Sequence, residues 1–81
     1  MIKQEPVICR TKWRNKIGGG ATILVGHASN RIVVKTWLPA GMNWDKDAPE
    51  WIDWCDSLEQ ARTAYKQRAA NLGRLGFSRI A

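Results

Sequence analysis

Residues 57–73 carry the pattern that most constrains the fold of this 81-residue chain. Apolar or small side chains recur there at spacings of three and four, which predicts one stripe on an amphipathic helix. The residues of this stripe are Leu58, Ala61, Tyr65, Ala69 and Leu72. Ser57 and Gln60 fit a capping box at the start, and Gly73 can turn left-handed past the end. Such a helix needs a partner layer, so we expect the preceding residues to form a sheet.

Three stretches before this helix alternate between apolar and polar residues, as half-buried strands do. They are Pro6–Arg14, Ala21–His27 and Arg31–Leu38, separated by a glycine-rich loop and a short turn. Short connections predict an antiparallel meander. The expected fold class is therefore α+β, with a three-stranded antiparallel sheet packed on one main C-terminal helix in a single domain of residues 1–81.

The connector between the third strand and the helix fits two local structures. Asp47-Ala48-Pro49-Glu50 has the order of a helix start, with an acid at the cap and proline in the first turn. The alternation of residues 51, 53 and 55 allows a short edge strand instead. The helix-start pattern favours a helical turn that breaks near Asp56. Of the three tryptophans Trp44, Trp51 and Trp54, we expect two to be buried, since a domain this small would otherwise expose a large apolar patch.

Charge is segregated along the chain, whose net charge is +6 and whose pI is about 9.9. Residues 1–44 carry a net +6, residues 45–59 a net −5, and residues 60–81 a net +5. A strongly basic balance favours an anionic partner, of which nucleic acid is the commonest. No apolar run has the length of a signal peptide or a membrane span, and Cys9 and Cys55 do not suggest a secreted disulfide framework. The expected location is the cytoplasm, with no membrane partner.

The strand alternation indicates where an anionic partner would bind. Arg10, Lys12 and Arg14 share one side of the first strand. Arg31, Lys35 and Trp37 share one side of the third and can join them. A basic sheet face with an exposed aromatic ring is a form that nucleic-acid-binding proteins use. The alternative, a solvated face whose basic side chains need no partner, is equally compatible with the sequence.

No arrangement of residues indicates catalysis. His27 is the only histidine, and Cys55 fits a small core residue better than a nucleophile. The three consecutive glycines at residues 18–20 lack the helix N-terminus and the Lys-Ser/Thr pair of a phosphate loop. The sequence therefore predicts a non-enzymatic protein without a metal, a cofactor or a small-molecule substrate.

The run DSLEQARTAYKQRAANLG, residues 56–73, is similar to the helix of the ethylene-response-factor type of DNA-binding domain. Related arm-binding domains occur in phage tyrosine recombinases. The resemblance implies three antiparallel strands followed by a helix, with strand Arg and Trp residues entering the major groove. By position, the corresponding residues are Arg10, Lys12, Trp13, Arg14, Lys35 and Trp37. The chain departs from the family in lacking its Tyr-Arg-Gly-Val start and in having a longer connector.

Two functions are predicted, from different classes. The first is a small nucleic-acid-binding protein, for which DNA is favoured over RNA, that uses the basic sheet face. The alternative is an accessory protein of a phage or mobile element that binds and modulates a host protein. In that case the acidic connector would be the contact surface, through Trp44, Trp51 and Trp54.

Overall fold

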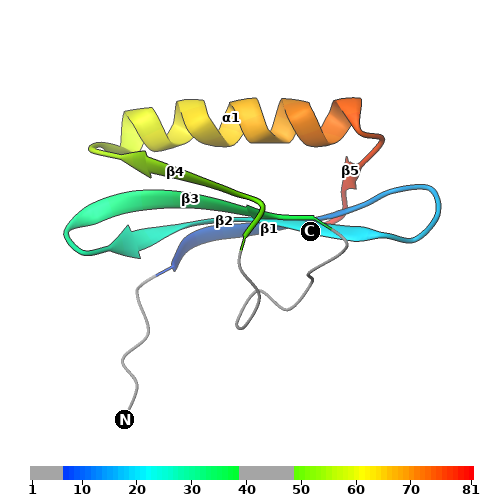
Figure 1. Ribbon diagram of the computed structural model, residues 1–81, viewed down its shortest axis with the longest axis horizontal. Helices are drawn as coiled ribbons and strands as arrows, with labels where there is room; N and C mark the ends of the chain where they lie inside the picture. The colour runs from blue at the N-terminus through cyan, green and yellow to red at the C-terminus, as the bar shows by residue number, and fades with distance from the viewer. Residues whose placement is uncertain (1–6, 39–48) are drawn as a thin grey trace, which may run out of the picture.

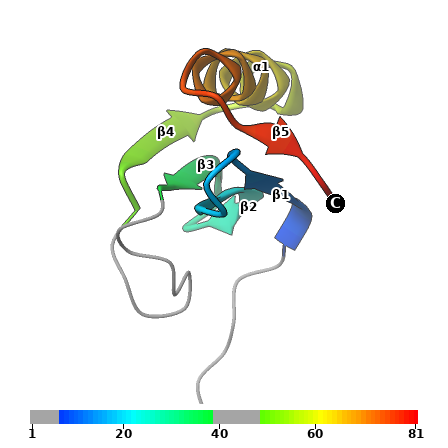
Figure 2. The same ribbon diagram turned by 90° about the vertical axis from the view of Figure 1, so that its right-hand side faces the viewer.

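The computed structural model describes residues 7–38 and 49–81. In chain order, its elements are β1 (Val7–Arg14), β2 (Gly20–Ala28), β3 (Arg31–Trp37), β4 (Trp51–Cys55), α1 (Leu58–Arg74) and β5 (Ser78–Arg79). The strands form one antiparallel sheet in the order β4-β3-β2-β1-β5. Helix α1 lies across one face of this sheet (Figure 1 and Figure 2). The predicted α+β class with a C-terminal helix is confirmed, but the sheet has five strands rather than three.

The two faces of the sheet are distinguished by their position relative to α1. We call the face that packs on α1 the proximal face and the opposite one the distal face. The proximal face holds the core, because alternate residues of β2, β3 and β4 pack there against the helix. The buried residues of this core are Ala21, Ile23, Val25, Ile32, Val34, Cys55, Ala61, Leu72 and Phe77.

The start of α1 is capped as the sequence predicts, but its end differs. Ser57 Oγ accepts a hydrogen bond from the Gln60 N–H at 3.2 Å, and Gln60 Oε1 accepts one from the Asp56 N–H at 2.8 Å. At the other end, Gly73 remains inside the helix, because the Leu75 N–H still bonds to the Asn71 carbonyl at 3.1 Å. The left-handed turn falls at Gly76, whose φ is +92°. The prediction that Gly73 makes this turn is therefore wrong.

The helical stripe is buried only in part. Leu72 is fully buried and Ala61 nearly so, while Tyr65 is half-buried and donates a hydrogen bond from its hydroxyl to Thr11 Oγ1 at 3.2 Å. Leu58 is 60% exposed. The expected burial of Leu58 is wrong, because this first helical residue lines an open groove beside β1 instead of the core.

The connector supplies a strand, so the prediction of a helical turn is wrong from residue 51 onward. Strand β4 pairs with β3 from Thr36↔Trp51 to Ile32↔Cys55. Because β3 is largely buried, leaving its outer backbone groups unpaired would cost free energy, and β4 satisfies them. The first half of the predicted helix start, Asp47-Ala48, lies outside the described residues.

Over the described part of the chain, the structure contains no helix that is both long enough and apolar enough to cross a membrane.

Candidate nucleic-acid interface

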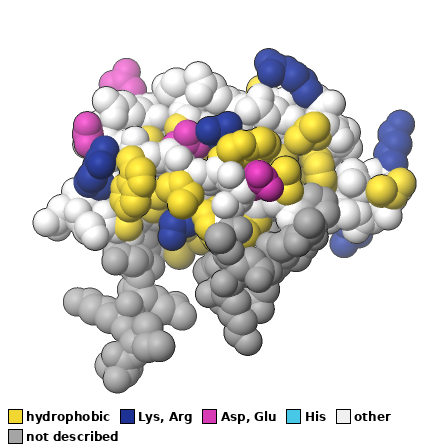
Figure 3. Space-filling model, viewed as in Figure 1, with side chains coloured by type: hydrophobic (Ala, Val, Ile, Leu, Met, Phe, Trp, Pro, Cys, Tyr) yellow, Lys and Arg dark blue, Asp and Glu magenta, His cyan; other side chains and the backbone are white. Residues whose placement is uncertain are grey.

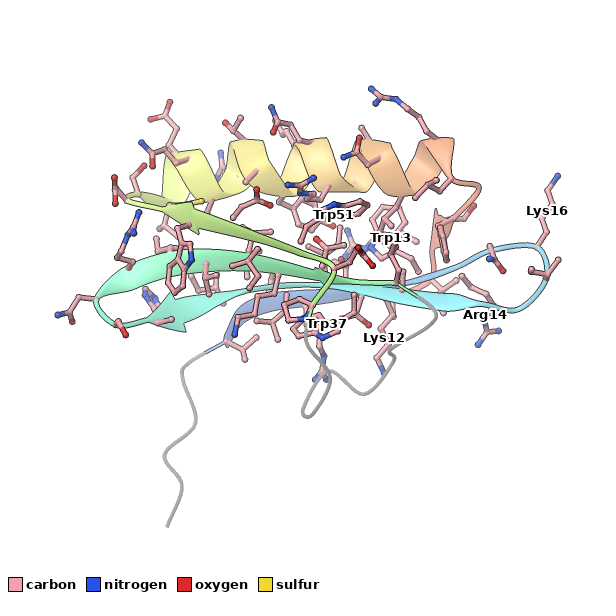
Figure 4. All side chains as sticks on the ribbon, in the orientation of Figure 1. Lys12, Trp13, Arg14, Lys16, Trp37 and Trp51 are labelled. Atoms are coloured by element: carbon pink, nitrogen blue, oxygen red, sulfur yellow. The ribbon has the colours of Figure 1, made fainter. Side chains whose placement is uncertain are left out.

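The strand register places the predicted basic residues together on the distal face. Arg10 pairs with Leu24, and Leu24 pairs with Lys35, so the two cations lie in one cross-strand row. In the next row Lys12 pairs with Thr22, and Arg14 follows on the same side of β1. Figure 4 shows Lys12 and Arg14 pointing away from α1. Alternate side chains of one strand are about 6.6–6.8 Å apart, so β1 carries an evenly spaced line of cations.

The distal face is also free of carboxylates along the strands that the structure describes. The residues that the alternation places there include five Lys or Arg and no Asp or Glu. The five are Arg10, Lys12, Arg14, Arg31 and Lys35. Like charges gathered on one face favour a polyanion as partner.

The cation at the far end of this set is already engaged. Arg31 forms an ion pair with Asp56 at 3.2 Å, and its guanidinium lies 5.5 Å from the centre of the Trp54 ring. Both charged side chains are largely exposed, so the ion pair itself contributes little stability. Its effect is to neutralise the β4 end of the face. Lys12 and Arg14 on β1 are exposed and lie on the same face, away from this ion pair.

Two predicted aromatic contacts are not available in this structure. Trp37 does lie on the distal face, but it is only 3% exposed, so the expected exposed ring is absent at this position. Trp13 lies on the proximal face, where its Nε1 donates to Thr11 Oγ1 at 3.0 Å and its ring packs against the core. Neither ring is positioned to stack on a base.

The Trp51 ring lies on the proximal side of β4, next to Arg68 of α1. The Arg68 guanidinium lies 4.8 Å from the centre of its ring. The same guanidinium donates two hydrogen bonds to Asp53, from Nε to Oδ2 at 2.8 Å and from Nη2 to Oδ1 at 2.9 Å. The hydrogen bonds to Asp53 raise the pKa of Arg68 above its ordinary value, and burial opposes this. Because a raised pKa keeps the cation charged until strongly alkaline pH, the pair persists throughout the neutral range.

Replacing Arg68 by methionine is expected to lower the free energy of unfolding by about 1–2 kcal/mol at neutral pH. The change leaves the Asp53 carboxylate, whose side chain is 26% exposed, without its bidentate partner, and uncovers the Trp51 ring. Urea unfolding followed by tryptophan fluorescence measures the difference. The matched control is Arg74→Met. Arg74 is exposed and, among the described residues, donates one side-chain hydrogen bond, to Asn71, so its loss should cost less than 0.5 kcal/mol. Equal effects would show that the Asp53–Arg68 pair does not hold β4 to α1.

The other described tryptophan is a surface residue. Trp54 is 49% exposed and its neighbour on the distal face, Ile52, is 48% exposed. Viewed from the β4 side, hydrophobic side chains gather along this strand below the helix (Figure 3). Trp51 is half-buried, and Trp44 lies outside the described residues. Neither Trp51 nor Trp54 is therefore fully buried, whereas two of the three tryptophans were expected to be. Ile52 was missed by the sequence reasoning, although its two-residue spacing from Trp54 places both on one face.

The remaining reactive side chains of the described residues are two cysteines and one histidine. Cys9 and Cys55 are both free thiols, and Cys55 is buried in the core as expected. Burial raises the pKa of the Cys55 thiol, and the Asp53 carboxylate raises it further, so this thiol is a poor nucleophile at neutral pH. His27 is exposed at the end of β2. Over residues 7–38 and 49–81, no group of three or more His, Cys, Asp or Glu side chains is arranged to hold a metal ion.

Comparison with protein-family models, with curated proteins and with solved structures finds no match to this chain.

Proposed function

We propose that this protein binds nucleic acid, without catalysis, through the cations of its distal face. The observation that carries the proposal is the register: β1 and β3 bring Arg10, Lys12, Arg14 and Lys35 to one side of the sheet, and no carboxylate of the described strands shares that side. Charges that gather on one face bind a phosphate backbone more strongly than the same charges scattered over the surface.

The geometry supports contact with phosphates more than reading of bases. Lys12 and Arg14 are exposed, while Trp37, the aromatic residue nearest to them on the distal face, is buried. Trp54 lies on β4, three strands from β1 and thus about 14 Å away. Binding of this kind depends on electrostatics and discriminates weakly among sequences. The resemblance of residues 56–73 to DNA-binding domains makes DNA the first ligand to test.

Affinity for DNA is expected to fall steeply with salt. Each duplex phosphate that is neutralised contributes about 0.9 to the log–log slope, because its counterion is released. Four or five contacts would weaken binding roughly 150- to 500-fold between 50 and 200 mM salt. Fluorescence anisotropy with labelled duplex and single-stranded DNA at both salt concentrations measures this slope. Absence of binding to both ligands at 50 mM salt would refute the proposal.

A second candidate function is supported by a separate observation on β4. Ile52 and Trp54 together expose an apolar patch at the edge of the sheet, on the distal side. We propose that this patch is a contact surface for another protein, because large exposed apolar side chains at one place are typical of protein interfaces. An accessory protein that modulates a host protein would need such a surface. This candidate uses residues different from the cations of β1, so one molecule can have both functions.

A further inference from the structure

Strand β4 ends the sheet on the side away from β5. The strand order places β3 on one side of β4, and no strand of the described residues lies on the other. Figure 2 shows β4 at this outer position, beside the start of α1. The free side of an edge strand presents backbone N–H and C=O groups that can pair with another extended chain.

A groove of about 650 Å³ runs along the same edge. Strand β4 forms one wall, and the flank of α1 forms the other, with Glu59, Gln60, Thr63 and Gln67. A chain added to β4 would lie about 4.8 Å from it and would fill this groove with its proximal side chains. The groove and the strand edge therefore form one site for an extended segment.

The two sides of an added strand would meet different surfaces. On the distal side they would meet Ile52 and Trp54, each about half exposed. On the proximal side they would meet the polar wall of Gln60, Thr63 and Gln67. Because successive side chains of a strand point to opposite faces, the complementary segment alternates apolar and polar residues.

Charge selects the polar residues of that segment. The charged side chains that line the groove, over the part of the chain that the structure describes, are the carboxylates of Asp53 and Glu59. Arg68 neutralises Asp53, but the described residues contain no ion pair to Glu59. A segment with Lys or Arg facing the groove would supply the missing partner.

We propose that the β4 edge binds an extended segment of another protein in which apolar residues alternate with Lys or Arg. The added strand would pair with the β4 backbone, cover Ile52 and Trp54, and place its cations beside Glu59. This inference rests on the second candidate function and specifies its binding mode and partner. It is independent of nucleic-acid binding by the distal cations.

A second copy of this chain fits the edge less well. Pairing two β4 edges would bring two sets of the same carboxylates together, including Glu50 and Glu59 from each copy. Like charges that face each other across paired strands are destabilising. The charge of the edge therefore favours a basic partner over self-association.

The test uses a ten-residue probe peptide that alternates lysine with valine, titrated into the isotopically labelled full chain and followed by NMR. Saturable shifts confined to β4 and the adjoining flank of α1 are expected. A peptide with the same composition but with five lysines followed by five valines should bind at least about tenfold more weakly, because it cannot place one residue type on each face. Equal binding of the two peptides would show that charge alone attracts them and would overturn the proposal.

Matched variants locate the site. Ile52→Lys should weaken binding of the alternating peptide at least about tenfold, because it removes apolar contact and adds a like charge. The control Ile17→Lys, at a loop residue that is 92% exposed, should leave it within about twofold. Glu59→Gln should weaken it about two- to fivefold, as expected for one exposed charge pair. No binding, or binding unaffected by Ile52→Lys, would overturn the proposal.

Two further measurements separate this inference from its competitors. Lys12→Glu should leave peptide binding unchanged, and Ile52→Lys should not weaken DNA binding, so failure of either function is recognised independently. Sedimentation velocity over a range of protein concentrations tests whether a second copy of the chain binds to the β4 edge instead. Self-association that Ile52→Lys abolishes would show that a second copy covers β4, and it would replace the proposed partner.

Discussion

Leu72→Ala is expected to lower the free energy of unfolding by about 2–5 kcal/mol, the largest stability effect predicted for this chain. Leu72 is completely buried where the last turns of α1 meet the sheet. Its carbonyl accepts the Phe77 N–H at 2.9 Å, so the chain that leaves the helix folds back over the same residue. Removing three side-chain carbons there leaves a cavity between α1 and the sheet. A small domain of this size has little stability in reserve.

Leu58→Ala provides the matched comparison. Leu58 lies on the same predicted stripe but is 60% exposed, so its truncation should cost about 1 kcal/mol or less. Urea or thermal unfolding of both variants measures the difference. Nearly equal losses would show that the packing of α1 on the sheet is not as described.

Local sequence patterns predicted the elements that have a clear period or a clear cap. The alternation of apolar and polar residues identified β1, β2 and β3 within one residue at most of their ends. Ser57 and Gln60 identified the start of α1 because a capping box depends only on residues a few positions apart. These features follow from short-range physics, which a single sequence contains.

The features that the sequence did not reveal depend on contacts between distant segments. The local pattern before residue 51 favoured a helical turn, and only the pairing with β3 decides that residues 51–55 form a strand. The burial of Trp37, which is 3% exposed, likewise could not be inferred from strand alternation alone. Leu58 has the spacing of a core residue but lies beyond the part of α1 that the core covers.

The candidate sites were predictable to different degrees. Side-chain alternation was enough to place Lys12 and Arg14 on one side of β1, because a strand allows only two directions. The register between strands then places Lys35 on the same face. It did not show that Arg31 is paired with Asp56, since these residues are 25 positions apart in the sequence and meet only through the β3–β4 pairing. The groove beside β4 likewise needs both the strand and the helix to be in place.

Reversing two charges on β1, with Lys12→Glu and Arg14→Glu combined, is expected to weaken DNA binding by about a hundredfold at 50 mM salt, or tenfold for each residue. Both side chains are exposed and point away from the core, so the fold should be retained. If each contacts one duplex phosphate, the log–log salt slope should also fall by about 1.8. Anisotropy titrations at several salt concentrations give the affinity and the slope together.

The control must change the net charge equally, because any reduction of the +6 total weakens attraction to DNA. Arg62→Glu combined with Lys66→Glu meets this condition, since both residues are exposed on α1, on the opposite side of the molecule from the distal face. Each double variant changes the net charge by −4, from +6 to +2. Only the β1 variant should lower the salt slope, because a general field effect does not remove a specific phosphate contact. An equal loss of affinity and slope in the helix variant would mean that DNA is attracted by total charge, and the distal face would not be the binding surface.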